Sequence, residues 1–170
     1  MDLKKYIRDV QDFPKPGIGF KDITTLLIAP EAVKEALQQF VALAKGKGIT
    51  KVVSMESRGF FFGPMIANEI NAGFVPVRKP GKLPYKTVKQ EYALEYGTDT
   101  LEMHLGAIEK GDKVLIHDDV LATGGTAEAV VKMVESQGAE VVQLDFLIDL
   151  TFLNGKDKLK GHHINALIEY

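Results

Sequence analysis

The chain has 170 residues, of which 45% are hydrophobic and 26% are charged, with a formal net charge of −2. This length and composition predict one soluble globular domain, residues 1–170, with a full hydrophobic core. The charge disfavours a nucleic-acid partner, and no apolar run approaches the ~20 residues of a membrane span. The absence of cysteine excludes disulfides and thiol chemistry. Because no export signal is seen either, we expect a cytoplasmic protein without a membrane partner.

The amino-terminal part predicts a short helix followed by an irregular segment. The helix, over residues 2–10, rests on apolar residues at helical spacing, namely Leu3, Tyr6, Ile7 and Val10. Residues 12–23 contain two prolines and two glycines, which argue against regular structure, together with the aromatic side chains of Phe13 and Phe20. From the residues alone, this segment either packs down as a lid or binds a flat ligand.

Strands and helices then alternate along the chain. Helices are expected at residues 30–44, 60–70 and from residue 127, and strands at 51–55, 74–77, 113–117, 141–150 and 164–170. Alternation of polar and apolar residues on both sides of Gly97 predicts an antiparallel hairpin. The βαβ order predicts an α/β fold with a parallel sheet.

Two charged stretches follow predicted strands. Glu56, Ser57, Arg58 and Gly59 come after the strand at residues 51–55, and the forked donors of Arg58 suit an anion. An ion pair of Arg58 with Glu56 or Asp22 fits the sequence equally well. The basic loop at residues 78–86 is either a solvated loop or a segment that closes over an anion.

The most informative stretch is Gly111 to Thr126. A predicted buried strand ends at the acids Asp118 and Asp119, and the small-residue loop that follows opens a helix. Such a loop offers inward N–H groups and hydroxyls to a phosphate. Carboxylates contact the hydroxyls of a ribose directly, by accepting hydrogen bonds, or through Mg²⁺. The two acids alone fit a helix cap or a solvated turn, and the two glycines alone fit a turn. The acids and the glycines together, in this order, are a more specific signal.

This combination resembles the phosphoribosyl-pyrophosphate (PRPP) signature of the type I phosphoribosyltransferases. The resemblance implies that Asp118 and Asp119 hold the ribose hydroxyls. It also implies that the 5′-phosphate is bound by the loop residues Ala122, Thr123, Gly124, Gly125 and Thr126.

Other motifs resemble the adenine phosphoribosyltransferases within that family. The segment after Asp12 is similar to their hood, which implies that Phe20 stacks on the base and that main-chain groups of Gly19 and Lys21 read its edge. Leu150 matches an aliphatic residue on the opposite face of the base. In the family, a Glu at the position of Glu95 is the proposed acid/base, followed by a Tyr as in Tyr96 here.

The stretch from Glu56 to Phe60 resembles the family's pyrophosphate loop, which commonly contains a cis peptide at the position of Glu56 and Ser57. The resemblance implies pyrophosphate binding by Glu56, Ser57, Arg58, Lys79 and Lys82, with Arg58 and Glu95 as the catalytic residues. It extends from Asp12 to about Leu153.

The resemblance implies a central, mostly parallel sheet flanked by helices, a small hood at about residues 10–24 and a mobile basic loop on a hairpin arm. It implies a purine salvage enzyme that forms a homodimer and joins adenine to PRPP. Mg²⁺ would bind together with PRPP and would have no direct side-chain ligand. Any contact with Asp118 or Asp119 would be through a water molecule. Another base specificity (hypoxanthine, xanthine or orotate) and a non-catalytic PRPP-sensing regulator remain the alternatives.

Overall fold

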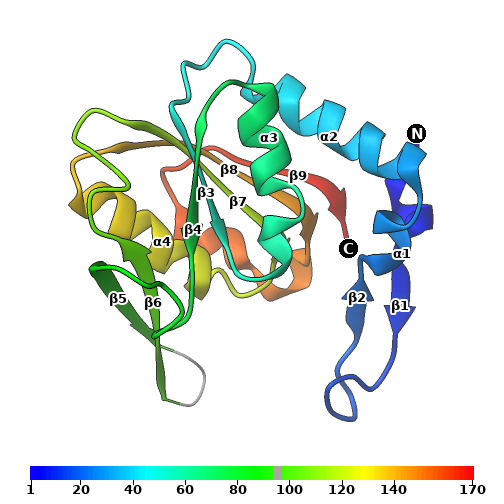
Figure 1. Cartoon of the computed structure of the whole chain (residues 1–170). Helices are drawn as coiled ribbons and strands as arrows, with labels where there is room; N and C mark the ends of the chain where they lie inside the picture. Colours follow the sequence, from blue (N-terminus) through cyan, green and yellow to red (C-terminus); the bar gives the residue numbers. More distant parts are fainter. Residues whose placement is uncertain (94–96) are drawn as a thin grey trace.

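The computed structural model describes residues 1–93 and 97–170 and has an α/β architecture (Figure 1). Its centre is a five-stranded sheet in the order β4-β3-β7-β8-β9, with every neighbouring pair parallel. The predicted α/β fold is confirmed. The strands of this sheet are β3 (Lys51–Met55), β4 (Gly73–Val77), β7 (Lys113–Leu121), β8 (Glu140–Asp149) and β9 (Ile164–Glu169).

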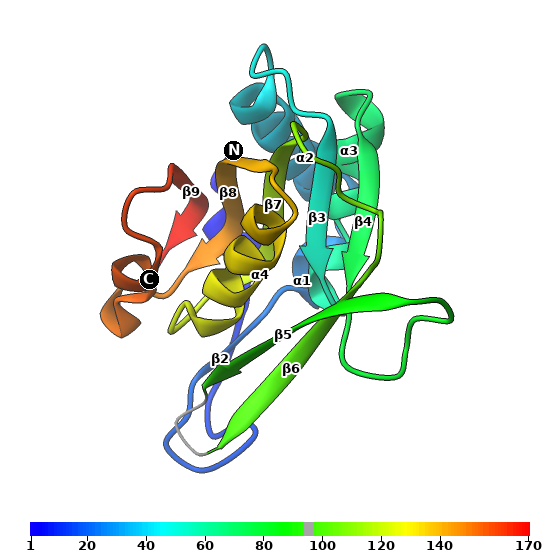
Figure 2. The same ribbon diagram turned by 90° about the vertical axis from the view of Figure 1, so that its left-hand side faces the viewer.

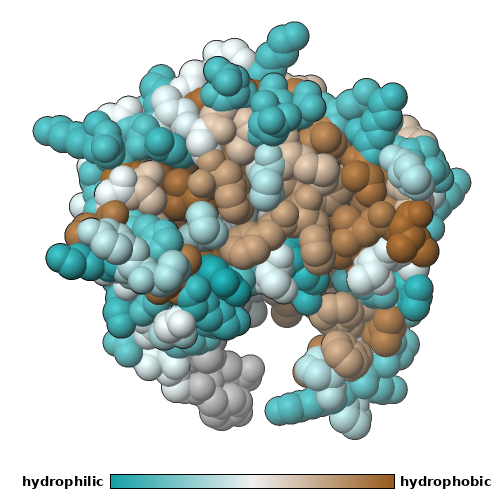
Figure 3. Space-filling model, viewed as in Figure 1, coloured by the Kyte–Doolittle hydropathy of each residue, from teal (hydrophilic) through white to brown (hydrophobic). Residues whose placement is uncertain are grey.

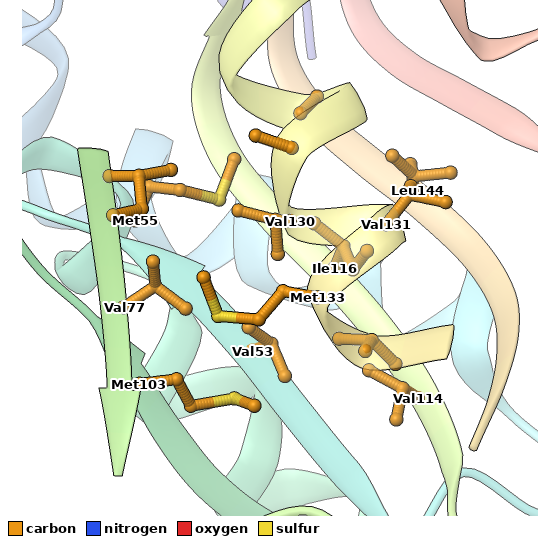
Figure 4. Packing of buried hydrophobic residues seen from close by; sticks show 14 of the residues in the cluster. Val53, Met55, Val77, Met103, Val114, Ile116, Val130, Val131, Met133 and Leu144 are labelled. Carbon is orange, nitrogen blue, oxygen red and sulfur yellow. The ribbon is translucent and has the colours of Figure 1, made fainter. Parts of the chain in front are cut away.

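Helices cover both faces of the sheet (Figures 1 and 2). One face carries α1 (Thr24–Leu27), α2 (Pro30–Ala44) and α3 (Gly63–Glu69), and the other carries α4 (Gly125–Ser136). Because side chains alternate along a strand, Val52 packs in the cluster of Phe40, whereas Val53 packs in the cluster of Val130 (Figure 4). No helix among the described residues is long and apolar enough to cross a membrane.

Two antiparallel strand pairs extend past the carboxyl ends of β3 and β4 (Figure 2). β1 (Arg8–Val10) pairs with β2 (Phe20–Asp22), and β5 (Thr87–Ala93) pairs with β6 (Thr98–His104). The remaining elements are short 3₁₀ turns: η1 (Leu3–Tyr6), η2 (Arg58–Phe60), η3 (Thr151–Leu153) and η4 (Gly155–Leu159).

Three sequence expectations are wrong at the level of local structure. The helix expected at residues 2–10 is η1 followed by β1, and Phe20–Asp22, expected to be irregular, is the strand that pairs with β1. Cross-strand hydrogen bonds between segments about ten residues apart outweigh a weak local helical pattern. The helix expected from Phe60 begins only at Gly63, because Pro64 fits the first turn of a helix.

Candidate active site

The two acids lie inside strand β7 rather than after it, which corrects the sequence expectation. Asp118 pairs with Phe146 of β8, and the pairing continues to Leu121 and Asp149. The strand extends further than its apolar run because β8 offers backbone partners along its whole length. Asp118 and Asp119 therefore have fixed backbone positions near the carboxyl edge of the sheet, where open α/β sheets bind ligands.

The carboxyl group of Asp118 lies in a confined position. It accepts a hydrogen bond from the Asp119 N–H at 2.9 Å, and a Cβ on Gly59 would lie 2.9 Å from its Oδ1. Gly59 thus lets η2 approach β7 closely. Burial, followed by the neighbouring carboxylate of Asp119, raises the pKa of Asp118 well above its usual value. Asp118 is consequently easier to protonate than an exposed aspartate.

Arg58 connects the acids to the amino-terminal strand pair. Its Nε donates to Oδ2 of Asp119, a residue that is only 4% exposed. Its guanidinium carbon also lies 5.0 Å from the centroid of the Phe20 ring, a distance typical of a cation–π contact. The partner of Arg58 is therefore Asp119, not Glu56 or Asp22 as the sequence also allowed, and three predicted site residues lie together.

The loop after β7 surrounds a small cavity of about 80 Å³, whose lining includes Asp118 and the predicted phosphate-binding residues. Gly124 has a φ of +79°, and a Cβ there would lie 2.4 Å from the carbonyl oxygen of Gly155. A glycine is required at position 124 for both reasons. The loop then enters α4, whose first N–H groups are available to an anion.

Glu56 contacts basic residues that follow strand β4. Its side chain is 6% exposed and pairs with Arg78 at 2.9 Å and with Lys82 at 3.0 Å, and it accepts the Lys79 N–H at 2.7 Å. Burial acts to raise the pKa of Glu56, but these hydrogen bonds and charges outweigh it and lower the pKa. Because a carboxylate has only acceptors, the Glu56 side chain holds the basic residues rather than an anion.

The side chain of Lys79 is held by the β5–β6 pair. Its ammonium group donates to Asp99 and, at 3.1 Å, to the hydroxyl of Tyr92. Burial lowers the pKa of Lys79, but its bonds to Asp99 and Tyr92 exceed that effect and raise the pKa. The basic loop is held further by Glu102, which pairs with Lys89 at 2.9 Å and accepts the Gly81 N–H at 3.1 Å.

Comparison with known proteins identifies the family of this chain. Residues 21–158 match the family model described as a phosphoribosyl transferase domain. The chain is 58% identical to the adenine phosphoribosyltransferase of Christiangramia forsetii over 100% of this chain and 99% of that protein. The chain belongs to the adenine phosphoribosyltransferase family.

Solved structures of this family have the same fold. The adenine phosphoribosyltransferase of Thermoanaerobacter pseudethanolicus superimposes with a TM-score of 0.96 at 47% identity, covering 99% of this chain and 98% of that one. The Giardia lamblia enzyme, solved with 9-deazaadenine, gives a TM-score of 0.93 at 37% identity and covers 99% and 96% of the two chains. The predicted type I phosphoribosyltransferase fold is thereby confirmed.

The remaining predicted site residues of the adenine phosphoribosyltransferase motifs are placed as follows. The peptide between Glu56 and Ser57 is cis. Leu150 lies just after β8, and its N–H donates to the carbonyl oxygen of Leu121 at 3.0 Å. Gly19 precedes β2 and Lys21 lies within it. Glu95 and Tyr96 lie outside the described residues.

Sequence reasoning missed several residues that shape this site. Arg78 and Asp99 hold Glu56 and Lys79 through ion pairs, yet each looked like an ordinary loop or turn residue. Gly155 supports the loop after β7 from a distant part of the chain, and its only local signal is the turn dipeptide formed with Asn154. Lys158 Nζ lies 3.6 Å from the position of a Cβ on Gly125, so a cation also lies near the loop.

Proposed function

We propose that the chain transfers the 5-phosphoribosyl group of PRPP to adenine, giving AMP and pyrophosphate, and so acts in purine salvage. The observation that carries this proposal is full-length similarity to relatives named adenine phosphoribosyltransferase, at 58% and 59% identity. In the reaction, N9 of adenine bonds to C1 of the ribose while the bond from C1 to the pyrophosphate oxygen breaks. The N9 proton leaves to a base.

The phosphoribosyl half of PRPP would bind at the end of β7. The cavity lined by Thr123, Gly124, Gly125 and Thr126 would hold the 5′-phosphate, because a glycine-rich loop at a helix start offers main-chain N–H groups, and its two threonines offer hydroxyls, to an anion. The Ala122 main chain would complete this loop. Asp118 and Asp119 would accept the ribose hydroxyls, which fixes C1 relative to the adenine side of the site.

The pyrophosphate would be bound by basic side chains of η2 and of the basic loop. Lys79 and Lys82 supply charge, Arg58 supplies forked donors, and Ser57 supplies main-chain and hydroxyl groups. Such groups stabilise the leaving group as the C1–O bond lengthens and the ribose gains oxocarbenium character. Arg58 would also connect the ribose side of the site to the adenine side, since it contacts both Asp119 and Phe20.

Adenine would lie between Phe20 and Leu150, with main-chain groups of Gly19 and Lys21 at its edge. Glu95 would accept the proton from the imidazole side of the base. A main-chain acceptor for the 6-amino group would be left without a donor by a 6-oxo purine, so hypoxanthine and guanine are expected to be poor substrates.

Mg²⁺ fits this donor set as a partner of PRPP rather than as a resident ion. The described residues contain no group of three or more His, Cys, Asp or Glu that could hold a metal, and Asp119 is engaged by Arg58. Mg²⁺ commonly keeps several waters and binds one or two carboxylates together with substrate phosphates. When bound with PRPP, it would neutralise charge on the diphosphate.

The active form would be a homodimer. Apolar surface gathers over α3 and continues toward α1 in the face shown in Figure 3. Phe61 and Ile28 are 42% and 79% exposed. Contiguous exposed apolar surface is typical of interaction sites, and a second copy of this chain is the partner we propose. Sedimentation equilibrium tests this assignment; a single monomeric species at micromolar concentration would contradict it. The cytoplasmic location stays a prediction.

One assay tests the central proposal. Pyrophosphate release from PRPP is measured with adenine, hypoxanthine, guanine, xanthine and orotate in turn, and adenine should be preferred by several powers of ten. Equal use of another base would assign a different specificity. Absence of release with every base, together with PRPP binding by calorimetry, would indicate a PRPP-sensing regulator.

Two variants test the proposed proton acceptor. Glu95→Gln and Glu95→Leu should lower kcat far more than they raise the KM for PRPP, because a proton-transfer group acts mainly in the transition state. Full activity in both variants would remove Glu95 from the mechanism.

A further inference from the structure

Two lysine side chains lie over the ring of Tyr170. Lys4 Nζ is 4.0 Å and Lys21 Nζ is 4.1 Å from the ring centroid. The Lys21 side chain is 15% exposed and also pairs with Asp9 of the adjacent strand at 3.0 Å. A lysine held against an aromatic face with so little access to water makes a stronger cation–π contact than an exposed one. Lys21 is therefore fixed from two directions.

The main chain of Tyr170 is tied to the residues on both sides of Leu150. Its N–H donates to the carbonyl oxygen of Asp149 at 3.0 Å. Its main-chain oxygen accepts the N–H of Thr151 at 2.9 Å and the Thr151 hydroxyl at 2.6 Å. Tyr170 thus fixes the segment on which Leu150 lies.

Lys21 and Phe20 are consecutive residues of strand β2, so their side chains point to opposite sides of the strand. Phe20 packs edge-on against Phe13, with ring centroids 5.1 Å apart, and has Arg58 over its ring. Lys21 points instead toward Asp9 and Tyr170. The contact with Tyr170 therefore supports β2 from the side opposite to the Phe20 ring.

We infer that Tyr170 is a positioning residue for the base. It joins the strand that carries Phe20 to the segment that carries Leu150, through its ring on one side and its main chain on the other. It thereby sets the spacing between the two side chains between which the base is to be held. This inference rests on the proposed function, because it takes Phe20 and Leu150 as the adenine-binding pair.

The test compares Tyr170→Leu with Tyr170→Phe. The leucine variant keeps an apolar side chain and all main-chain bonds but loses the ring, and it should raise the KM for adenine about five- to tenfold. The KM for PRPP should stay unchanged, because the phosphate loop has other supports. The phenylalanine variant keeps the ring and should restore the wild-type KM for adenine.

A second pair of variants separates the two lysines on the ring. Lys21→Met keeps most of the stem but loses the charge, and it should raise the KM for adenine as Tyr170→Leu does. Lys4→Met removes the other cation, which belongs to η1 and not to the Phe20 strand, and should leave that KM unchanged. An equal rise in both variants would show a general anchor of the amino-terminal segment and would overturn the inference.

A final comparison distinguishes failure of this inference from failure of the proposed function. Phe20→Leu should raise the KM for adenine strongly. If it does so while Tyr170→Leu has a wild-type KM for adenine, the positioning role is wrong and the base site stands. If Phe20→Leu leaves the KM for adenine unchanged, the proposed base site itself is wrong. Parallel rises in both KM values and a lower melting temperature for Tyr170→Leu would reduce Tyr170 to a structural residue and overturn the inference.

Discussion

The loop after β7 and the basic loop after β4 are both proposed to bind phosphate groups, yet different forces hold them in place. The loop after β7 is held by backbone packing, since Gly124 and Gly155 approach too closely to admit a Cβ on either. The basic loop is held by ion pairs, in which Glu56 and Asp99 engage Lys82 and Lys79. Close backbone contacts hold one loop, and charged side chains hold the other.

This difference indicates how each loop would respond to its ligand. A loop fixed by close packing is preorganised, so a 5′-phosphate would bind without rearrangement. Lysines that are already paired must exchange a carboxylate for a phosphate, and partly exposed pairs contribute little to stability. The basic loop is therefore the part that should rearrange when PRPP binds.

The largest expected effect comes from the acids beside the packed loop. Asp118→Asn and Asp119→Asn keep their size but lose an anionic acceptor, and should cost ~2–4 kcal/mol in transition-state stabilisation with PRPP. Asp119→Asn should have the larger effect, because it also leaves Arg58 without its partner. Steady-state kinetics with a circular dichroism control measures this; unchanged kcat/KM in both variants would rule out the ribose-binding role.

The second prediction concerns the buried histidine that precedes Asp118 in strand β7. His117 is fully buried against Phe40, and its Nδ1–H donates to the carbonyl oxygen of Asp145 at 2.9 Å. Burial lowers the pKa of His117 from 6.5 to about 4. Between these values the unfolded state binds a proton that the folded state excludes, so stability falls as pH falls. The loss attributable to His117 should reach about 3 kcal/mol at pH 4.

Urea unfolding at pH 7 and pH 4 measures this contribution. His117→Asn should unfold more easily at pH 7 but lose less stability between the two pH values than the wild type. The difference in pH dependence between the wild type and His117→Asn isolates the contribution of His117 from that of Asp145. Burial raises the pKa of Asp145, so this group changes stability with pH in the opposite direction. His162→Asn, at a more exposed histidine, is the matched control. Equal pH dependence in the wild type and His117→Asn would contradict the prediction.

The third prediction tests the close packing of the loop after β7 directly. A Cβ on Gly155 would lie 2.2 Å from the carbonyl oxygen of Ala122, so Gly155→Ala must displace backbone. It should weaken PRPP binding by about 2 kcal/mol. Gly106→Ala is the control for backbone strain alone, since Gly106 has a φ of +80° and no atom within 4 Å of an added Cβ. Wild-type affinity for PRPP in Gly155→Ala would show that packing does not fix this loop.

The smallest expected effect is at the ion pair of the basic loop. Asp99→Asn weakens the hold on Lys79 and should change stability by less than about 1 kcal/mol. It should slightly lower the KM for PRPP, because Lys79 no longer has to leave a carboxylate. Lys160→Met, at an exposed pair with Asp157, is the control. A higher KM for PRPP in Asp99→Asn would show that the pair orders the loop for binding.

Hydrogen exchange with and without PRPP sharpens the same comparison. The sequence predicts that residues 79–91 are mobile and become ordered, but Thr87–Ala93 form strand β5. Protection on PRPP binding is therefore expected mainly in residues 78–86, with little change in the loop after β7. Equally slow exchange in both states would contradict a closing loop.

The sequence by itself determined the fold class and the elements with strong local signals. Helix α2, from Pro30 to Ala44, and strand β3, from Lys51 to Met55, begin and end where their patterns predict. The same holds for the alternation of strands and helices along the chain. Local periodicity is sufficient there because the pattern of apolar residues and the tertiary packing favour the same structure.

Only the tertiary structure decided which side chains meet. The contact of Arg58 with Asp119 and Phe20, and the support of Gly124 by Gly155, join residues far apart in the chain. Several acids in the sequence have a local context similar to that of Asp119. Only the register of the strands brings one of them within reach of Arg58. The length of β7 was decided in the same way, because hydrogen bonding to β8 extends a strand beyond its own apolar residues.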